Sequence, residues 1–185
     1  DAELRAWGWR IPFFIGALCA VVALYLRLSL HETSSEKSRS DEGAGSLRAI
    51  FTHHLKPFLL VVGYTAGGSL IFYTFTTYMQ KYLVNTAHMD LRTVNVVMTL
   101  VLFTYMLMQP PFGALSDRIG RRTQMRLFGV LATVGTVPLL YAIGGVTSPY
   151  MAYVLIVLAL AIVSLYTSIS GVVKAEMFPP EVRAL

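Results

Sequence analysis

Polar side chains recur along one apolar segment at spacings of three and four residues. Between Pro57 and Gln80 the segment carries no charge, yet hydroxyl and amide groups appear at regular intervals. On a helix, this spacing places the side chains on one face. Such groups can bind a small polar solute in a cavity, or they can hydrogen-bond to another helix, and both interpretations stay open. The residues are Ser69, Tyr73, Thr76, Thr77 and Gln80.

Two other apolar segments carry sparser versions of this pattern, and a lysine, Lys81, directly follows the segment that ends at Gln80. Lys81 could compensate the charge of a carboxylate ligand. It could equally be a lysine whose ammonium reaches the membrane surface, which is common at the end of a spanning helix. The sparser sets are Asn95, Thr99 and Gln109 in one segment and Ser164, Thr167, Ser168 and Gly171 in the other.

Arginines are clustered around a single aspartate in the sequence GALSDRIGRR, residues 113–122. Gly113 and Gly120 would permit close helix approach and a tight turn. Asp117 could accept charge-assisted hydrogen bonds from Arg121 or from a neighbouring helix N-terminus. The cluster therefore suits an electrostatic contact between helix ends. The alternative is a group of charges that only fixes the orientation of the chain in a membrane.

The composition identifies an integral membrane protein. Hydrophobic residues make up 55% of the 185 residues and charged residues 14%, and the mean hydropathy is +0.60. In soluble domains about 45–50% of the residues are apolar and about 25% are charged. Residues 127–173 form 47 consecutive uncharged positions, about twice what one bilayer crossing needs. The net charge of +5 is dispersed in short runs between apolar segments. A soluble domain, a disordered chain and a nucleic-acid-binding surface are therefore excluded.

Five apolar segments are long enough to cross a bilayer as helices, so we expect an all-α, polytopic fold. Counted on alternating sides of five spans, 11 Lys and Arg residues fall on one side and 4 on the other. The richer side is expected to be cytoplasmic, which places the N-terminus in the periplasm and the C-terminus in the cytoplasm. The predicted spans are 11–30, 57–84, 93–116, 127–145 and 150–173. Around them we expect a periplasmic segment 1–10, a cytoplasmic linker 31–56, a cytoplasmic loop 117–126 and a cytoplasmic end 174–185.

No pattern in the sequence indicates an enzyme, a metal site or an organic cofactor. The nucleophile, zinc and phosphate-binding motifs of common enzymes are absent from the sequence. Cys19 is the single cysteine and has no partner for a disulfide or a thiolate metal site, so we expect it to pack as a small apolar residue. No Asp or Glu lies within a predicted span, so the spans show no carboxylate that could relay a proton at the centre of a membrane.

Five stretches carry a family resemblance. The sequence GALSDRIGRR resembles the GxxxDRxGRR signature of the major facilitator superfamily. The sequence AEMFPPEVRA, residues 175–184, resembles the E-x-F-P-x-x-x-R segment that follows helix 10 in that family. The sequence WGWRIPF, residues 7–13, and the stretches 73–86 and 164–178 are similar to its metabolite:proton symporter branch. By the order of these elements, the five spans resemble helices 6 to 10 of a twelve-helix transporter, and the chain is expected to be a piece of it.

The resemblance implies a secondary active transporter of the bacterial inner membrane, with proton-coupled uptake of 2-oxoglutarate (alpha-ketoglutarate) or a similar dicarboxylate by alternating access. Alternatives are a symporter of another metabolite, such as shikimate, citrate or an osmolyte, and a truncated membrane protein that transports nothing. The implied partners are a small dicarboxylate, the lipid bilayer and the remaining helices of the full-length transporter, with the proton as coupling ion and no nucleic acid.

The resemblance also assigns roles to the polar residues. Helices 7 and 10 line the central cavity in this superfamily, and the signature loop resembles an intracellular latch that breaks during alternating access. The implied cavity residues are Ser69, Tyr73, Thr76, Thr77, Gln80, Lys81, Gln109, Ser164, Thr167 and Ser168. The implied latch residues are Gly113, Asp117, Arg118, Gly120, Arg121, Arg122, Glu176 and Arg183, with Lys174 as a further partner.

Overall fold

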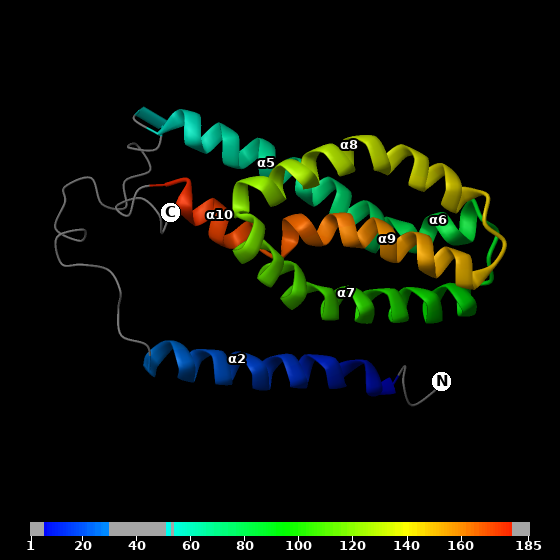
Figure 1. Ribbon diagram of the computed structural model, residues 1–185. Coiled ribbons are helices and arrows are strands. Elements are labelled where there is room, and N and C mark those ends of the chain that lie inside the picture. Colours follow the sequence, from blue (N-terminus) through cyan, green and yellow to red (C-terminus); the bar gives the residue numbers. More distant parts are fainter. Residues whose placement is uncertain (1–5, 30–50, 53, 179–185) are drawn as a thin grey trace. The chain divides into compact units, whose positions relative to one another are not determined.

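The computed structural model describes residues 6–29, 51, 52 and 54–178, and within these ranges the chain is helical without any strand. Five helical stretches are long and apolar enough to cross a membrane, which confirms the expected all-α, five-span class. The chain forms two compact units, residues 1–42 and 43–185. The elements are η1 (Gly8–Arg10), α2 (Ile11–Ser29), α5 (Leu55–Tyr73), η2 (Thr74–Tyr78), α6 (Met79–Asn85), α7 (Leu91–Ile119), α8 (Arg121–Gly144), α9 (Pro149–Thr167) and α10 (Ser170–Glu176) (Figure 1).

The first unit contains one described helix, α2, preceded by the 3-10 turn η1. Aromatic rings gather at its start, where Trp7 stacks on Phe14 with ring centroids 5.9 Å apart. Cys19 is exposed on this helix rather than packed, contrary to the sequence-based expectation. The difference arises because, among the described residues, α2 has no second helix within its own unit to cover it. Most of the predicted linker 31–56 lies outside the described residues.

The second span is one continuous helical path in which α5 and α6 are joined by the π-helical turn η2. The hydroxyls of Thr74 and Thr76 donate to the backbone carbonyls four residues earlier, at 2.8 and 2.6 Å. A π turn holds one more residue than an α turn and therefore rotates the faces on either side of it. From within this turn onward, Phe75, Met79 and Leu83 are buried at intervals of four.

The third span, α7, begins at a capped N-terminus and continues through two prolines. The Asp90 carboxylate accepts from the backbone N–H groups of Arg92 and Thr93 at 3.0 and 3.3 Å, which satisfies donors that have no partner within the helix. Pro110 and Pro111 lie inside α7 without ending it. The ribbon changes direction over the last part of this helix, in accord with proline's missing donor and steric clash (Figure 1).

Residues 117–126 are helical except at Gly120, which corrects the expected loop. Gly120 has φ +85°, a conformation that glycine adopts without steric penalty. Its N–H donates to the Ser116 carbonyl at 2.9 Å, and its own carbonyl accepts from the Gln124 N–H at 3.1 Å. A single glycine therefore connects α7 to α8. The sequence-based boundary was wrong because charged residues ended the apolar pattern without ending the helix.

The core of the second unit is α9, which packs against both α7 and α8 and also touches α5 (Figure 1). Ile156, Leu160 and Val163 on this helix have no exposed surface. Ala152 and Ala159 are equally buried, and such small residues let membrane helices approach closely. The most hydrophobic span is thus the one with the most buried surface.

The fifth span is broken, although the sequence predicted one helix over 150–173. α9 ends at Thr167 and α10 begins at Ser170, with two residues between them outside regular helix. α10 extends to Glu176, beyond the predicted end of the span.

Candidate functional site

A polar cluster joins α7 to α9 within the apolar core. The Tyr105 hydroxyl donates to Thr167 Oγ1 at 2.7 Å, and Thr167 Oγ1 donates to Gln109 Oε1 at 2.9 Å. Gln109 Nε2 donates to Ser164 Oγ at 3.2 Å and to the Tyr105 carbonyl at 3.1 Å. The structure thus brings together three predicted cavity residues, Gln109, Ser164 and Thr167.

The hydrogen-bond donors of this cluster are all used within the protein. The Ser164 hydroxyl, which is fully buried, donates to the Leu160 carbonyl at 2.8 Å. These contacts are hydrogen bonds between helices, one of the two interpretations that the sequence left open, and a ligand would have to displace one of them. The lining of a substrate cavity by Gln109, Ser164 and Thr167 stays a prediction. Tyr105 was missed by the sequence analysis, although it lies one helical turn before Gln109 and so shares its face.

The predicted polar stripe on α5, η2 and α6 lies at the surface of the described bundle. Tyr73, Thr77 and Gln80 are exposed, with 60% of Tyr73 accessible, whereas Ser69 and Thr76 are partly buried. A polar face of a membrane helix must meet protein or a water-filled cavity rather than lipid. The stripe is therefore the face on which this unit would meet further protein or an aqueous cavity.

One end of this stripe is tied to α7. Gln80 Nε2 donates to Asn95 Oδ1 at 2.5 Å, which also gives Asn95 a partner across the two helices. Beside it, Lys81 lines a cavity of about 310 Å³ together with Gln80, Val84, Asn85 and Leu91. Lys81 forms no ion pair within the described ranges, so its role as a carboxylate ligand stays a prediction.

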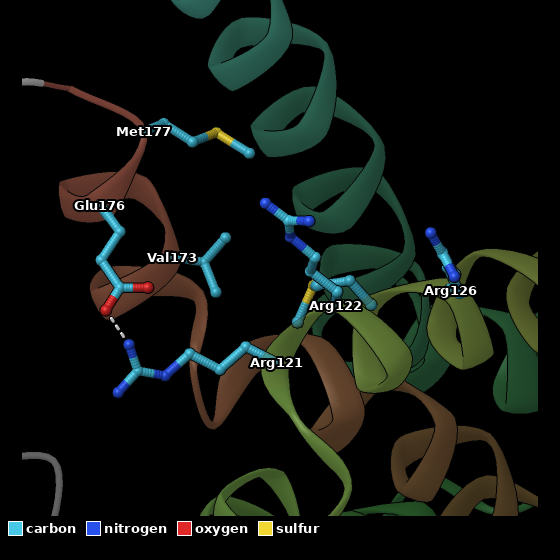
Figure 2. Close-up of a pocket in the computed structure, with 7 residues that line it drawn as sticks. Arg121, Arg122, Arg126, Val173, Glu176 and Met177 are labelled. Carbon is cyan, nitrogen blue, oxygen red and sulfur yellow. Dashed lines mark hydrogen bonds and ion pairs between the residues drawn. The ribbon is translucent and has the colours of Figure 1, made fainter.

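The predicted latch contains one ion pair, between Arg121 and Glu176 (Figure 2). Arg121 is the first residue of α8 and Glu176 the last of α10, so the pair joins the two helix ends. It borders a cavity of about 490 Å³, which is also lined by Arg122, Met125, Arg126, Val173 and Met177. The two side chains are 42% and 51% exposed, so we expect the pair to contribute about 0–1 kcal/mol to stability.

The other predicted latch contacts differ from expectation. Arg121 reaches Glu176 rather than Asp117, and Asp117 has no hydrogen bond or ion pair in the part of the chain that the structure describes. Arg118 and Arg122 are exposed. The Lys174 ammonium lies 5.7 Å from the centroid of the Tyr166 ring, a cation–π contact instead of an ion pair. Arg183 lies outside the described residues.

The close helix approach expected at Gly113 occurs at Gly68 instead. A Cβ atom placed at Gly113 would meet no heavy atom within 4 Å, whereas one at Gly68 would lie within 3.0 Å of three atoms of the Tyr166 ring. Tyr166 also packs against Tyr64 and Phe128, with ring centroids 4.8 and 5.2 Å apart. Gly68 therefore lets α5 pack directly on the C-terminal turn of α9.

Gln124 on α8 is a buried polar residue that the sequence analysis did not select. It has no exposed surface, and its Nε2 donates to the Leu165 carbonyl at 3.0 Å and to Ser168 Oγ at 3.2 Å. Ser168, a predicted cavity residue, is thus held by α8 rather than by the cluster around Gln109. The sequence held no signal for this role, because Gln124 lies among the polar and charged residues of the RRTQMR stretch, residues 121–126.

Comparison with known proteins gives one family and several relatives. A family model described as the Major Facilitator Superfamily matches residues 4–185. The chain is 59% identical over its full length to the alpha-ketoglutarate permease of Escherichia coli (strain K12), of which it covers 43%. It is 34% identical over 74% of its length to the citrate-proton symporter of Salmonella typhi, of which it covers 32%. It is 29% identical over 99% of its length to the proline/betaine transporter of Escherichia coli (strain K12), of which it covers 39%. No solved structure matches the chain.

Proposed function

Because the chain belongs to the Major Facilitator Superfamily, we propose that it is the helix 6 to 10 portion of a secondary active transporter that takes up 2-oxoglutarate or a similar dicarboxylate with protons. The family assignment made from the sequence motifs is confirmed. The observation that carries the substrate proposal is the 59% identity, along the whole chain, to a protein named as an alpha-ketoglutarate permease. The chain spans less than half the length of that protein, so the activity belongs to the longer transporter.

The geometry supports different roles for the two polar regions, substrate binding at the exposed face and helix positioning by the cluster around Gln109. The face with Tyr73, Thr77 and Gln80 is exposed in this unit, apart from the bond of Gln80 to Asn95, and would be available to a central cavity. Lys81 borders a cavity at one end of this face and would pair with a substrate carboxylate. The buried cluster around Gln109 would position α7 against α9 and thereby shape the cavity wall. Alternating access would be completed by the opposing helices of the full-length transporter.

The Arg121–Glu176 pair is proposed to be a latch on the cytoplasmic side of a bacterial inner membrane. Alternating access requires contacts that form in one state and break in another. An exposed ion pair of about 0–1 kcal/mol can be broken at little cost, which suits a reversible contact. The orientation follows from the excess of Lys and Arg on that side of the five spans. The coupling proton would be carried by Asp117 or by groups outside this chain.

The substrate can be tested in proteoliposomes that contain the full-length protein. We expect labelled 2-oxoglutarate to accumulate when an inward proton gradient is imposed, and the accumulation to be lost with a protonophore. Citrate is the competing substrate to include, because of the 34% identity to a citrate-proton symporter, and betaine is a further competitor. Preferential uptake of citrate or betaine would refute the substrate proposal, and uptake indifferent to the protonophore would refute proton coupling.

A further inference from the structure

The break between α9 and α10 leaves the Leu165 carbonyl without its usual helical partner. In a continuous helix, the Ile169 N–H would donate to the Leu165 carbonyl. It donates instead to the Tyr166 carbonyl at 3.4 Å, and Ile169 has φ −127° and ψ 0°, outside the helical region. Leu165 is buried, and a carbonyl inside a membrane protein needs a partner from within the protein.

The side chain of Gln124 supplies that partner. Its amide donates one hydrogen to the Leu165 carbonyl at 3.0 Å and another to Ser168 Oγ at 3.2 Å. A single buried side chain from α8 therefore bridges the two sides of the break. Its Oε1 is also buried and has no partner among the described residues, so the contact is made by the donors alone.

We infer that Gln124 is a positioning residue that holds α9 and α10 apart as two helices and thereby places Glu176 against Arg121. The link to gating rests on the proposed function, in which this ion pair is the latch. Arg121 and Gln124 are three residues apart on α8 and share a face. One face of α8 thus contacts the broken span at two points, one at the break and one at its far end.

The surroundings determine which side of the break moves. On the α9 side, the Tyr166 ring is held between Tyr64 and Phe128 and lies directly over Gly68. On the other side, α10 has no fully buried residue. A change at the break therefore displaces α10 and leaves α9 in place.

Loss of the Gln124 donors has a defined structural consequence. The Leu165 carbonyl is then left with one nearby donor, the Ile169 N–H, and this bond continues α9 into α10. Each residue added to the helix turns the following segment by about 100°. Such a turn carries Glu176 away from Arg121 and separates the ion pair.

The inference can be tested by distances between spin labels in the full-length protein, after its other cysteines have been replaced. One pair of labels, at the exposed positions Thr123 and Val172, reports on α8 and α10 across the break. A reference pair, at Val130 and Leu158, reports on α8 and α9 before the break; both positions are exposed. In Gln124→Leu we expect the first distance to shift by on the order of 5 Å, because a turn of about 100° moves a side chain that lies about 5 Å from the helix axis. The reference distance should stay unchanged.

Thr136→Val is the matched control. Thr136 lies on α8 like Gln124 and is partly buried. Its hydroxyl, however, donates only to the carbonyl of Ala132 in the same helix, at 2.6 Å. We expect this variant to leave both distances unchanged. An unaltered 123–172 distance in Gln124→Leu would overturn the inference. Equal changes in both pairs would overturn it as well, because they would indicate general loosening of the bundle.

Uptake measured in the same preparations separates this inference from the proposed function. Gln124 does not lie on the exposed polar face, so Gln124→Leu should lower the maximal uptake rate severalfold and leave the apparent substrate constant within about twofold. If the unsubstituted protein transports no dicarboxylate and the distance still shifts, the proposed function fails and the positioning role stands. If it transports normally and the distance does not shift, the positioning role fails alone.

Discussion

Replacement of Gly68 by alanine tests the packing of α5 against α9. The added Cβ would lie within 3.0 Å of three atoms of the Tyr166 ring, and this ring is confined by Tyr64 and Phe128. Overpacking of this kind costs about 1–3 kcal/mol, whereas glycine to alanine in a helix gains about 1 kcal/mol. Gly68→Ala should therefore range from no net change to a loss of about 2 kcal/mol in the free energy of unfolding.

The adjacent residue Gly67 supplies the control, because it lies in the same helix and a Cβ there would meet nothing within 4 Å. Gly67→Ala should keep the helical gain without the clash, so the two variants should differ by about 1–3 kcal/mol. Equilibrium unfolding of the full-length protein in mixed micelles measures this difference. Tyr166→Leu should abolish it by removing the ring. Equal stability of the two alanine variants in the presence of Tyr166 would refute the packing argument.

Three further predictions concern the polar residues. Lys81→Gln should raise the apparent substrate constant by about 10- to 150-fold, as expected for a lost charge-assisted bond of roughly 1.5–3 kcal/mol; unchanged uptake kinetics at normal membrane levels would instead indicate a lysine that only reaches the membrane surface. Tyr105→Phe removes the donor to Thr167 and should lower the free energy of unfolding by about 1 kcal/mol, measured in mixed micelles; a larger loss than Thr167→Val would contradict this account. Arg121→Gln should change stability by less than about 1 kcal/mol, because Arg121 and Glu176 are half exposed, but should alter the cytoplasmic accessibility of cavity cysteines if the pair is a latch. Accessibility equal to that of the unsubstituted protein would remove the latch role.

The sequence identified the fold class and the family because both depend on local properties. A bilayer admits apolar segments of about 20 residues only as helices or closed barrels, so the uncharged stretches predicted five spanning helices without any knowledge of their packing. The cluster at Asp117 and Arg121 is a contiguous pattern, and contiguous patterns are visible in a single sequence. The ends of the helices were harder to predict from the sequence. Gly120, at which the sequence allowed a tight turn, alone forms the connection between α7 and α8, whereas the charges around it led to the prediction of a ten-residue loop, 117–126.

The roles of the polar residues were decided only by the tertiary structure. Thr77 and Thr167 are the same residue type in two spanning helices, yet Thr77 is exposed and Thr167 is bound between Tyr105 and Gln109. The polar atoms of a buried side chain need partners, and the partner is chosen by which helices pack together.

Gln124 is a residue whose role could not be predicted from the sequence at all. Composition and spacing gave it no significance, because one amide among the arginines of residues 121–126 forms no pattern. Its importance arises from a break in α9–α10, more than 40 positions later in the sequence, whose free carbonyl lies within its reach. The sequence by itself therefore determined how many helices cross the membrane and to which family they belong. The packing of α5, α8 and α9 around Tyr166 and Leu165 determined which polar groups meet, since hydrogen bonds between distant segments depend on distances that no local pattern records.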